Sequence, residues 1–255
     1  MNVTERRQRI MKLIQNNRSI TYKELLREFN VTKETIRKDL NALSEKGYIV
    51  RTLGGALFLE EFDPDIELRS ISNHEEKRLI AREAYKLIKP KDIIAIDSGS
   101  STLELAYLIT GDIEVVVLTN SFTVLSTVAK QKSVTAIGTG GVLRPHSLSF
   151  QGETTENMMR FYNIHKAFIT ATALDIDKGI MDSNEGEAVI KRAMLNNVQD
   201  ATLLADHSKF TSMAYITVCP VNKVNRIITS SLSDPEIVEK YRQKGIEVIV
   251  VPYLE

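Results

Sequence analysis

The chain has 255 residues, of which 43% are hydrophobic and 26% charged, and its 33 Lys and Arg balance its 33 Asp and Glu. This composition is typical of a globular protein with a sizeable core and argues against a disordered or fibrous chain. The lone Cys219 excludes an internal disulfide, and we find neither a signal peptide nor an apolar run of about 20 residues, so we expect a cytoplasmic protein.

The charge is unevenly distributed along the chain. Residues 1–58 contain 12 Lys and Arg against 6 Asp and Glu, which leaves 21 against 27 for the remainder. A basic N-terminal segment followed by an acidic remainder indicates that the N-terminal segment alone binds a polyanion. A solvated charged surface would have the same composition, so charge by itself leaves both interpretations open.

Three helices are predicted in the first 46 residues. The first begins near Thr4, and the second begins at Thr21, with Glu24 three residues later as in a capping box. Asn30 suits a left-handed turn before the third helix. Apolar residues at positions 36, 40 and 43 of that helix recur with helical spacing, so its opposite face points to solvent, and Gly47 is expected to end it.

Two short helices joined by a tight turn, with basic and polar residues near the start of the second, are typical of a DNA-reading helix-turn-helix. The segment 48–59 alternates like a strand, turns at Gly54 and Gly55 and returns, which predicts a two-stranded wing. The expected DNA contacts are Thr32, Lys33, Thr35, Arg37, Lys38, Asn41, Arg51 and Thr52. Binding of RNA or of a protein by this N-terminal segment is disfavoured, because only Tyr22 and Tyr48 could serve as stacking aromatics.

The composition and periodicity of the sequence change after residue 58. A polar stretch over 59–75 contains Pro64 and is predicted to be a linker. Apolar runs then alternate with helical patterns such as 103–109, 122–129 and 187–198. The runs lie at 92–97, 114–119, 134–138, 166–171, 201–206, 226–230 and 247–251. This alternation predicts an α/β domain over 76–255 with a parallel sheet covered on both faces.

Small polar residues follow several of these runs, at the edge where such sheets bind ligands. The candidate contacts to a small anion are Asp97, Ser98, Gly99, Ser100, Ser101, Thr102, Asn120, Ser121, Gly140, Gly141, Asp206 and Lys209. Taken singly, each of these could be a helix cap, a turn or a solvated lysine. There is no Walker or Rossmann glycine pattern and no metal-ligand spacing, so no cofactor or metal is expected.

The residues from Val31 to Ala56 resemble the signature of the DeoR family of bacterial transcriptional regulators. The shared pattern is Thr-Ile-Arg-x-Asp-Leu from Thr35, then Gly47, then Arg-Thr-x-Gly-Gly-Ala from Arg51. Segments 96–102, 119–121, 138–141, 186–194 and 205–210 resemble the sensor domain of that family. The resemblance implies a winged helix-turn-helix over 1–58 and a sensor similar in fold to ribose-5-phosphate isomerase.

The resemblance also implies partners and a function. These are operator DNA, a phosphorylated sugar or related metabolite as the effector, a homo-oligomer (dimer or tetramer), and repression of a sugar-utilisation operon. Thr170 and Ala173 stand where members of the family commonly carry glycines, so we expect their side chains to narrow the pocket or to restrict its backbone, and a contact by Asp175 is left open. Glu187 and Lys191, spaced i, i+4, favour a plain helix pair over a ligand or interface role.

The main alternative is a sugar-phosphate isomerase with an accessory DNA-binding head. Asp97, Asp206 and Lys209 are candidates for its proton transfers. However, residues 171–175 are a poor substitute for the Asp-Gly-Ala-Asp-like segment of the isomerases that the sensor resembles. His146 and His207 have no fixed carboxylate partner in the sequence and are interpreted as binding or surface residues.

Overall fold

The computed structural model describes residues 1–45, 49–58 and 65–253. These residues form two compact units, Met1–Ser72 and Asn73–Glu255. We call the first unit the head and the second the sensor, and describe each by itself.

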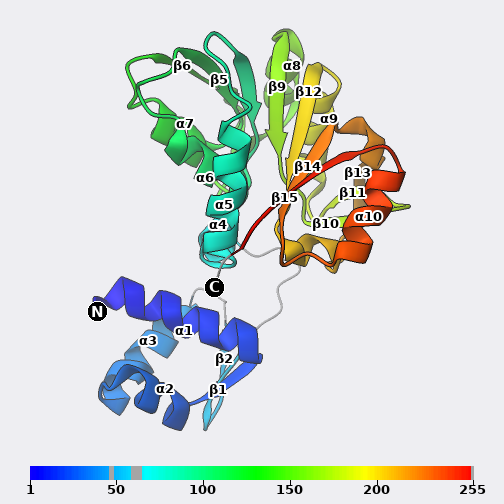
Figure 1. Cartoon of the computed structure of the whole chain (residues 1–255). Coiled ribbons are helices and arrows are strands. Elements are labelled where there is room, and N and C mark those ends of the chain that lie inside the picture. The colour runs from blue at the N-terminus through cyan, green and yellow to red at the C-terminus, as the bar shows by residue number, and fades with distance from the viewer. Residues whose placement is uncertain (46–48, 59–64, 254–255) are drawn as a thin grey trace. The chain divides into compact units, whose positions relative to one another are not determined.

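The head contains the predicted helices and the predicted wing (Figure 1). Its elements are α1 Val3–Asn17, β1 Ser19–Thr21, α2 Tyr22–Phe29, α3 Lys33–Glu45, β2 Ile49–Arg51, β3 Gly55–Phe58 and α4 Ile66–Ile71. The capping box at the start of α2 is confirmed, because Glu24 N donates to Thr21 Oγ1 over 3.3 Å and Thr21 N donates to Glu24 Oε2 over 2.7 Å. Strand β1 was not predicted and pairs with β3, which makes the wing a three-stranded antiparallel sheet.

The core of the head lies under α3, as its periodicity predicts. Ile36, Leu40 and Leu43 are buried there, together with residues of α1 and α2. Leu68 of α4 belongs to the same core. The structure therefore differs from the expected linker over 59–75, because a helix occupies part of it and is held by this apolar contact. Gly47 and Tyr48 lie outside the described residues.

One helix start in the head differs from the expected one. Helix α1 begins at Val3 and not after Thr4. The side chain of Asn2 accepts a 2.8 Å hydrogen bond from Glu5 N, so a capping asparagine two residues earlier satisfies the open end of the helix.

The sensor is built on one parallel sheet of seven strands, as predicted. The strands are β4 Ile93–Ile96, β5 Val115–Thr119, β6 Val134–Gly138, β9 Ile164–Ile169, β12 Val198–Leu204, β14 Arg226–Ser230 and β15 Glu247–Val251. Their order across the sheet is β15-β14-β12-β9-β4-β5-β6. Strands β4, β5 and β6 therefore follow one another towards one edge of the sheet. Strands β9, β12, β14 and β15 follow one another towards the other edge. The neighbours β4 and β9 mark the switch point, where sheets of this kind bind ligands.

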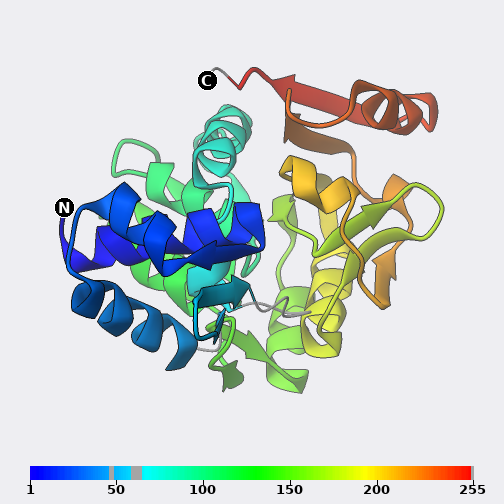
Figure 2. The ribbon, with the colours of Figure 1, turned by 90° about the horizontal axis from the view of Figure 1, so that it is seen from below.

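Helices cover both faces of the sheet (Figure 1, Figure 2). They are α5 His74–Tyr85, α6 Ser100–Leu108 and α7 Phe122–Val128 on one face, and α8 Glu153–Phe161, α9 Glu185–Leu195 and α10 Pro235–Gln243 on the other. Adjacent strand residues alternate between the two cores, with Ile94 and Ile96 facing α5–α7 and Ala95 facing α8–α10. Burial on both faces explains why the strands are apolar runs without alternating polar residues.

Smaller elements lie between these strands and were not predicted. A hairpin joins β7 Val142–Arg144 to β8 Ser149–Gln151, and a second sheet contains β10 Ala173–Asp175, β11 Gly179–Asp182 and β13 Ile216–Cys219. Two short 3₁₀ helices follow, His207–Phe210 and Val221–Lys223. Within the described part of the chain, no helix has the length and apolar character needed to cross a membrane.

Candidate DNA-reading surface and effector site

Helix α3 presents the polar face expected of a recognition helix. Lys33, Arg37 and Lys38 are exposed, whereas Thr35 and Asn41 are half-buried. Thr32 is exposed at the start of the helix and accepts a 3.2 Å hydrogen bond from Thr35 N, so it acts as the cap that the sequence predicts. The first turn of α3 is therefore well ordered and accessible to a partner.

The exposed cations of this surface make only surface contacts. Arg37 donates to Glu34 over 2.8 Å and 2.7 Å. The Lys33 ammonium lies 5.6 Å from the centre of the Tyr22 ring, and Arg51 donates to the Tyr22 hydroxyl over 3.4 Å. Surface ion pairs contribute little, about 0–1 kcal/mol, so a phosphate can replace these partners at small cost.

Asp39 ties this recognition helix to α1. Its carboxylate is 1% exposed and accepts hydrogen bonds from Arg6 Nε over 2.6 Å and from Arg7 Nε over 2.9 Å. Both partners lie more than 30 positions earlier in the chain, so the residues around Asp39 do not reveal them.

The wing depends on a glycine at its turn. A Cβ added at Gly55 would lie 1.9 Å from the carbonyl oxygen of Ile20, so β1 approaches too closely for any side chain. Thr52 N donates to Gly55 O over 3.0 Å and closes the turn. Arg51 and Thr52 are exposed beside it, where a DNA backbone could reach them.

The most connected polar group of the sensor is the carboxylate of Asp97, at the end of β4. Its Oδ1 accepts from Gly99 N over 3.0 Å and from Thr102 Oγ1 over 2.8 Å. Its Oδ2 accepts from Thr170 N over 2.9 Å and from the Thr170 hydroxyl over 3.1 Å. Asp97 thus joins the loops after β4 and β9, the two strands at the switch point, and its acceptor capacity is used within the protein.

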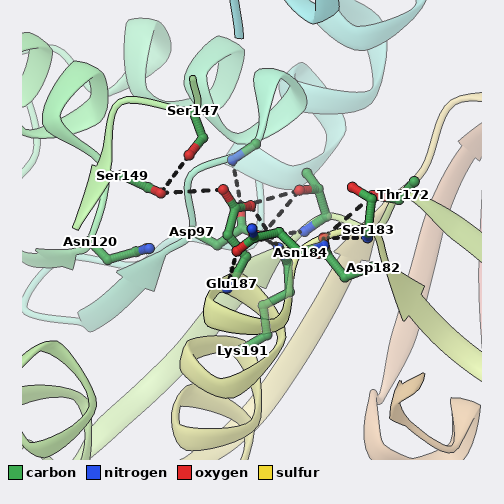
Figure 3. Close-up of polar contacts among 12 residues, drawn as sticks. Asp97, Asn120, Ser147, Ser149, Thr172, Asp182, Ser183, Asn184, Glu187 and Lys191 are labelled. Atoms are coloured by element: carbon green, nitrogen blue, oxygen red, sulfur yellow. Dashed lines mark hydrogen bonds and ion pairs between the residues drawn. The ribbon is translucent and has the colours of Figure 1, made fainter. Parts of the chain in front are cut away.

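Lys191 of α9 lies among three carboxylates (Figure 3). Its ammonium is 2.8 Å from Asp182 Oδ2, 3.4 Å from Asp97 Oδ2 and 3.7 Å from Glu187 Oε2. Burial would lower the pKa of Lys191, but these three carboxylates outweigh it and hold that pKa above its ordinary value. The i, i+4 pair favoured by the sequence is therefore the longest of three contacts, and Lys191 belongs to a buried charge network.

The hairpin β7–β8 continues this network. Glu187 Oε1 accepts hydrogen bonds from Arg144 over 3.3 Å and from the Ser149 hydroxyl over 3.2 Å. The hydroxyls of Ser147 and Ser149 are 2.7 Å apart. Figure 3 shows Ser147 and Ser149 on the Asn120 side of Asp97. Sequence reasoning missed Asp182, Arg144 and the two serines, because they lie on or beside short strands that the sequence did not predict.

Two buried polar atoms near the neighbouring strand ends have no hydrogen-bond partner among the described residues. They are Asn120 Oδ1, after β5, and Thr139 Oγ1, after β6. The other amide atom of Asn120 donates to the carbonyl of Phe150 over 3.4 Å, which orients Oδ1 as the open acceptor. Buried polar groups normally have partners, so these two atoms call for a water or a ligand. Sequence reasoning named Asn120 and missed Thr139.

The loops around these atoms suit close approach of a ligand. Gly140 and Gly141 have φ values of 63° and 109°, a region that favours glycine. Ser98, Ser100 and Ser101 are buried, and Ser121 caps α7 by accepting from Val124 N over 3.2 Å. Helix α6 has Gly99 as its cap, without a side-chain hydrogen bond. Its first-turn N–H groups are therefore left for another acceptor.

Thr170 stands directly against this turn. A Cβ at Gly99 would lie 2.0 Å from Thr170 Oγ1, so the two positions share one small space. Ala173 is fully buried in β10. Asp175, at the end of β10, accepts from the backbone of residues 177 and 178.

Asp206 and Lys209 follow β12, but the hydrogen bonds of Asp206 do not reach the Asp97 network within the described residues. Asp206 Oδ1 accepts from Asn73 Nδ2 over 3.0 Å, and Oδ2 lies 4.0 Å from the Lys77 ammonium, both at the start of α5. Burial raises the pKa of Asp206, but the charges of Lys209 and Lys77 and its hydrogen bonds outweigh it and bring the pKa to about 2.

Comparisons with known proteins agree with this two-part architecture. Residues 6–62 match the model of the DeoR-like helix-turn-helix domain, and residues 72–231 match the DeoR C terminal sensor domain. The uncharacterized HTH-type transcriptional regulator YulB of Bacillus subtilis is 34% identical over 99% of this chain and 98% of its own. The lactose phosphotransferase system repressor of Lactococcus lactis is 30% identical over 95% and 97%. Among solved structures, ribose 5-phosphate isomerase A of Methanocaldococcus jannaschii is 18% identical over 55% of each chain, with a TM-score of 0.40.

Proposed function

Because the chain belongs to the DeoR family of DNA-binding transcriptional regulators, we propose that it represses a sugar-utilisation operon and that a phosphorylated sugar modulates its operator binding. The name of the Lactococcus relative, a lactose phosphotransferase system repressor, supports the direction of this proposal. A regulator of this kind acts where the chromosome is, which supports a cytoplasmic location.

The DNA-binding part rests on the exposed face of α3 and on the wing. Arg37 is exposed and Thr35 is half-buried in the first half of α3, and we propose that they reach base edges in a major groove, together with the half-buried Asn41 one turn further along the helix. Lys33 and Lys38 are suited to phosphates, and Arg51 with Thr52 on the wing to the DNA backbone. One head makes few contacts, so we propose a homo-oligomer, dimer or tetramer, that places paired heads on one operator.

The effector part depends on one observation: the N-terminus of α6, which has no side-chain cap, lies at the switch point, and the ends of the next two strands carry two buried polar atoms without a hydrogen-bond partner among the described residues. Backbone N–H groups and the dipole of α6 favour an anion such as a phosphate. Asn120 Oδ1 and Thr139 Oγ1 can bind sugar hydroxyls. The proposed contacts are Ser98, Gly99, Ser100, Ser101, Thr102, Asn120, Ser121, Thr139, Gly140 and Gly141, with Lys209 after β12 and with Asp97 holding the turn.

We propose a DNA-binding unit that extends through α4 and a sensor that begins near Asn73. The DNA-binding unit then ends later than the expected residue 58, because Leu68 packs in the head, and the sensor begins three residues before the expected residue 76.

The charge network supports a binding role over catalysis. A catalytic acid or base needs a pKa near the working pH. The pKa of Lys191 is raised and that of Asp206 is lowered to about 2, so each is fixed in one protonation state. Together with the family to which the chain belongs, this supports our proposal that the chain is a regulator and not an isomerase.

A titration of the full chain on DNA from upstream of its own gene tests both parts. Binding should weaken steeply between about 50 and 200 mM salt, because Lys and Arg release counterions from phosphates. One compound in a panel of sugar phosphates should change the affinity about tenfold or more. Binding that no compound shifts would overturn the effector part alone. Turnover of ribose 5-phosphate by the same preparation would favour the isomerase instead.

A further inference from the structure

The parallel sheet of the sensor ends on one side at β6, which pairs only with β5 among the described strands (Figure 1). Two backbone hydrogen bonds bracket this pairing. Before β6, Val115 N donates to Ser133 O over 3.4 Å, and after β6, Thr139 N donates to Thr119 O over 3.1 Å. Backbone groups of successive residues point to alternate sides of a strand. The odd-numbered residues of β6 therefore bond to β5, and the even-numbered residues face the outer edge of the sheet.

Three residues thus direct their backbone N–H and C=O groups away from β5, namely Val134, Ala136 and Gly138. The N–H group of Val134 is satisfied locally, because it donates to Gln131 O over 3.2 Å. The N–H groups of Ala136 and Gly138 and the carbonyls of all three residues have no hydrogen-bond partner in the part of the chain that the structure describes. An edge strand with such open groups is a template for pairing with a further strand.

Strand β6 lacks the features that keep edge strands from associating. Its five residues include no charged residue and no proline, and its register against β5 runs without a bulge. The opposite edge of the sheet differs. Strand β15 begins with Glu247, which accepts from Arg226 over 3.0 Å, and Pro252 follows its last residue. Charge and proline at an edge oppose pairing, so β15 is protected from association and β6 is not.

The open groups of β6 are complementary to those of a second copy of the same strand. In an antiparallel pair centred on Ala136, the two Ala136 residues exchange both of their N–H···O bonds. The N–H group of Gly138 in each copy then meets the carbonyl of Val134 of the partner subunit. Every open N–H group of the edge gains an acceptor in this register. The Val134 N–H group, which already has a partner, is the one outer donor that the pairing leaves unused.

The residues around β6 also suit a second copy. The charged residues nearest to the strand are Lys130 and Lys132. The pairing would place them opposite the uncharged residues 140–142 of the partner subunit, so like charges do not face each other. Val142 is 74% exposed and Leu143 40%. Val142 lies four positions after the end of β6, within about 14 Å, so exposed apolar surface is available close to the strand pair.

We propose that two copies of the chain associate through antiparallel pairing of their β6 edges, centred on Ala136, which joins the two parallel sheets. This rests on the proposed function, since it gives the proposed homo-oligomer an interface. The last residue of β6, Gly138, directly precedes the loop 139–141, which belongs to the proposed effector site. The subunit contact and this loop are thus parts of one continuous segment.

Sedimentation equilibrium of the full chain tests the inference through the self-association constant. Ala136→Pro removes the central N–H group, which does not bond to β5, so the hydrogen bonds inside the sheet are kept. We expect the constant to fall about thirtyfold or more, because two hydrogen bonds between the subunits are lost. Ala136→Gly is the matched control, because it keeps the N–H group. It should change the constant less than about fivefold.

Charges at Thr135 test the same contact without altering the backbone. The side chain of Thr135 is exposed, and in the proposed pair it lies diagonally beside Thr135 of the partner subunit. Thr135→Lys and Thr135→Glu should each weaken self-association about threefold or more, because like charges meet. An equimolar mixture of the two variants should restore it. Thr217→Lys, at an exposed threonine of the edge strand β13, is the control and should leave the constant unchanged.

Weaker association in Ala136→Pro, and recovery in the mixture of the two Thr135 variants, would support the interface. If Ala136→Pro fails to fold, the mixture decides, because its substitutions lie at an exposed side chain. An oligomer that neither Ala136→Pro nor the Thr135 variants weaken would overturn the inference and leave the proposed homo-oligomer standing. A chain that stays monomeric at all concentrations would overturn both.

Discussion

Thr170 donates to Asp97 twice, from its backbone N–H over 2.9 Å and from its hydroxyl over 3.1 Å to the same carboxylate oxygen. These two hydrogen bonds connect the loops that follow β4 and β9 at the switch point. The Thr170 side chain fills the space that a Cβ at Gly99 would need. The turn that leads into α6 is therefore shaped jointly by Gly99 and Thr170, which are 71 positions apart.

Gly99→Ala should destabilise the sensor by about 1–3 kcal/mol, because the added Cβ would lie 2.0 Å from Thr170 Oγ1. Combining it with Thr170→Gly should recover part of this loss by removing the obstructing side chain. Urea unfolding of the two single variants and the double variant gives the coupling energy. Strictly additive effects would contradict the shared space.

Lys191→Met should cost about 3–5 kcal/mol, because it leaves three buried carboxylates without their shared cation. The control is Lys240→Met on the exposed side of α10, which should change the free energy of unfolding by no more than about 0.5 kcal/mol. Both are measured by urea unfolding at neutral pH. Equal effects of the two substitutions would show that the network does not stabilise the sensor.

Asp206 should make the sensor sensitive to acid. Its pKa is lowered from 3.8 to about 2, so its contribution to stability is complete above about pH 4 and is lost as the pH falls towards 2. Between about pH 5 and pH 2 the unaltered chain should lose about 2 kcal/mol more than Asp206→Asn. Asp112→Asn, at an exposed carboxylate, should retain the full acid sensitivity. An unchanged pH profile in Asp206→Asn would contradict the assignment.

Asp39→Asn should destabilise the head by about 3 kcal/mol, because it leaves the buried guanidinium of Arg6 without its carboxylate. Limited proteolysis should then cut within residues 1–72 while the sensor stays intact, and DNA affinity should fall. Glu28→Gln breaks the exposed pair with Arg9 and should have little effect. Cleavage in both units at the same rate would argue against a separate head.

Lys38→Ala should weaken binding to all DNA sequences alike and reduce the salt slope by about 1, as expected for one lost phosphate contact. Arg37→Ala should in addition relax the preference for the operator, if its guanidinium reaches a base edge. Competition titrations with operator and unrelated DNA separate these effects. Lys240→Ala in the sensor provides the charge-matched control, and a similar loss there would point to non-specific attraction.

Much of the fold follows from local patterns. The seven apolar runs predicted the seven strands, and the capping pattern at Thr21 and the spacing of Ile36, Leu40 and Leu43 predicted the head helices. These features depend on neighbours within a few residues, so a single sequence contains them. The hairpin β7–β8, the small sheet with β10 and helix α4 lack such strong periodicity, because they are short and held by packing.

Local sequence patterns therefore specify the two-part organisation and the reading helix with its wing, and they indicate the edge of the sheet where polar residues collect. Tertiary structure alone decided which of those residues meet: Asp97 with Thr170 and Lys191, Asp39 with Arg6, and Asp206 with Asn73. These contacts join positions far apart in the chain. They depend on strand order and on which face of the sheet a helix covers, and neither is specified by the pattern around any one residue.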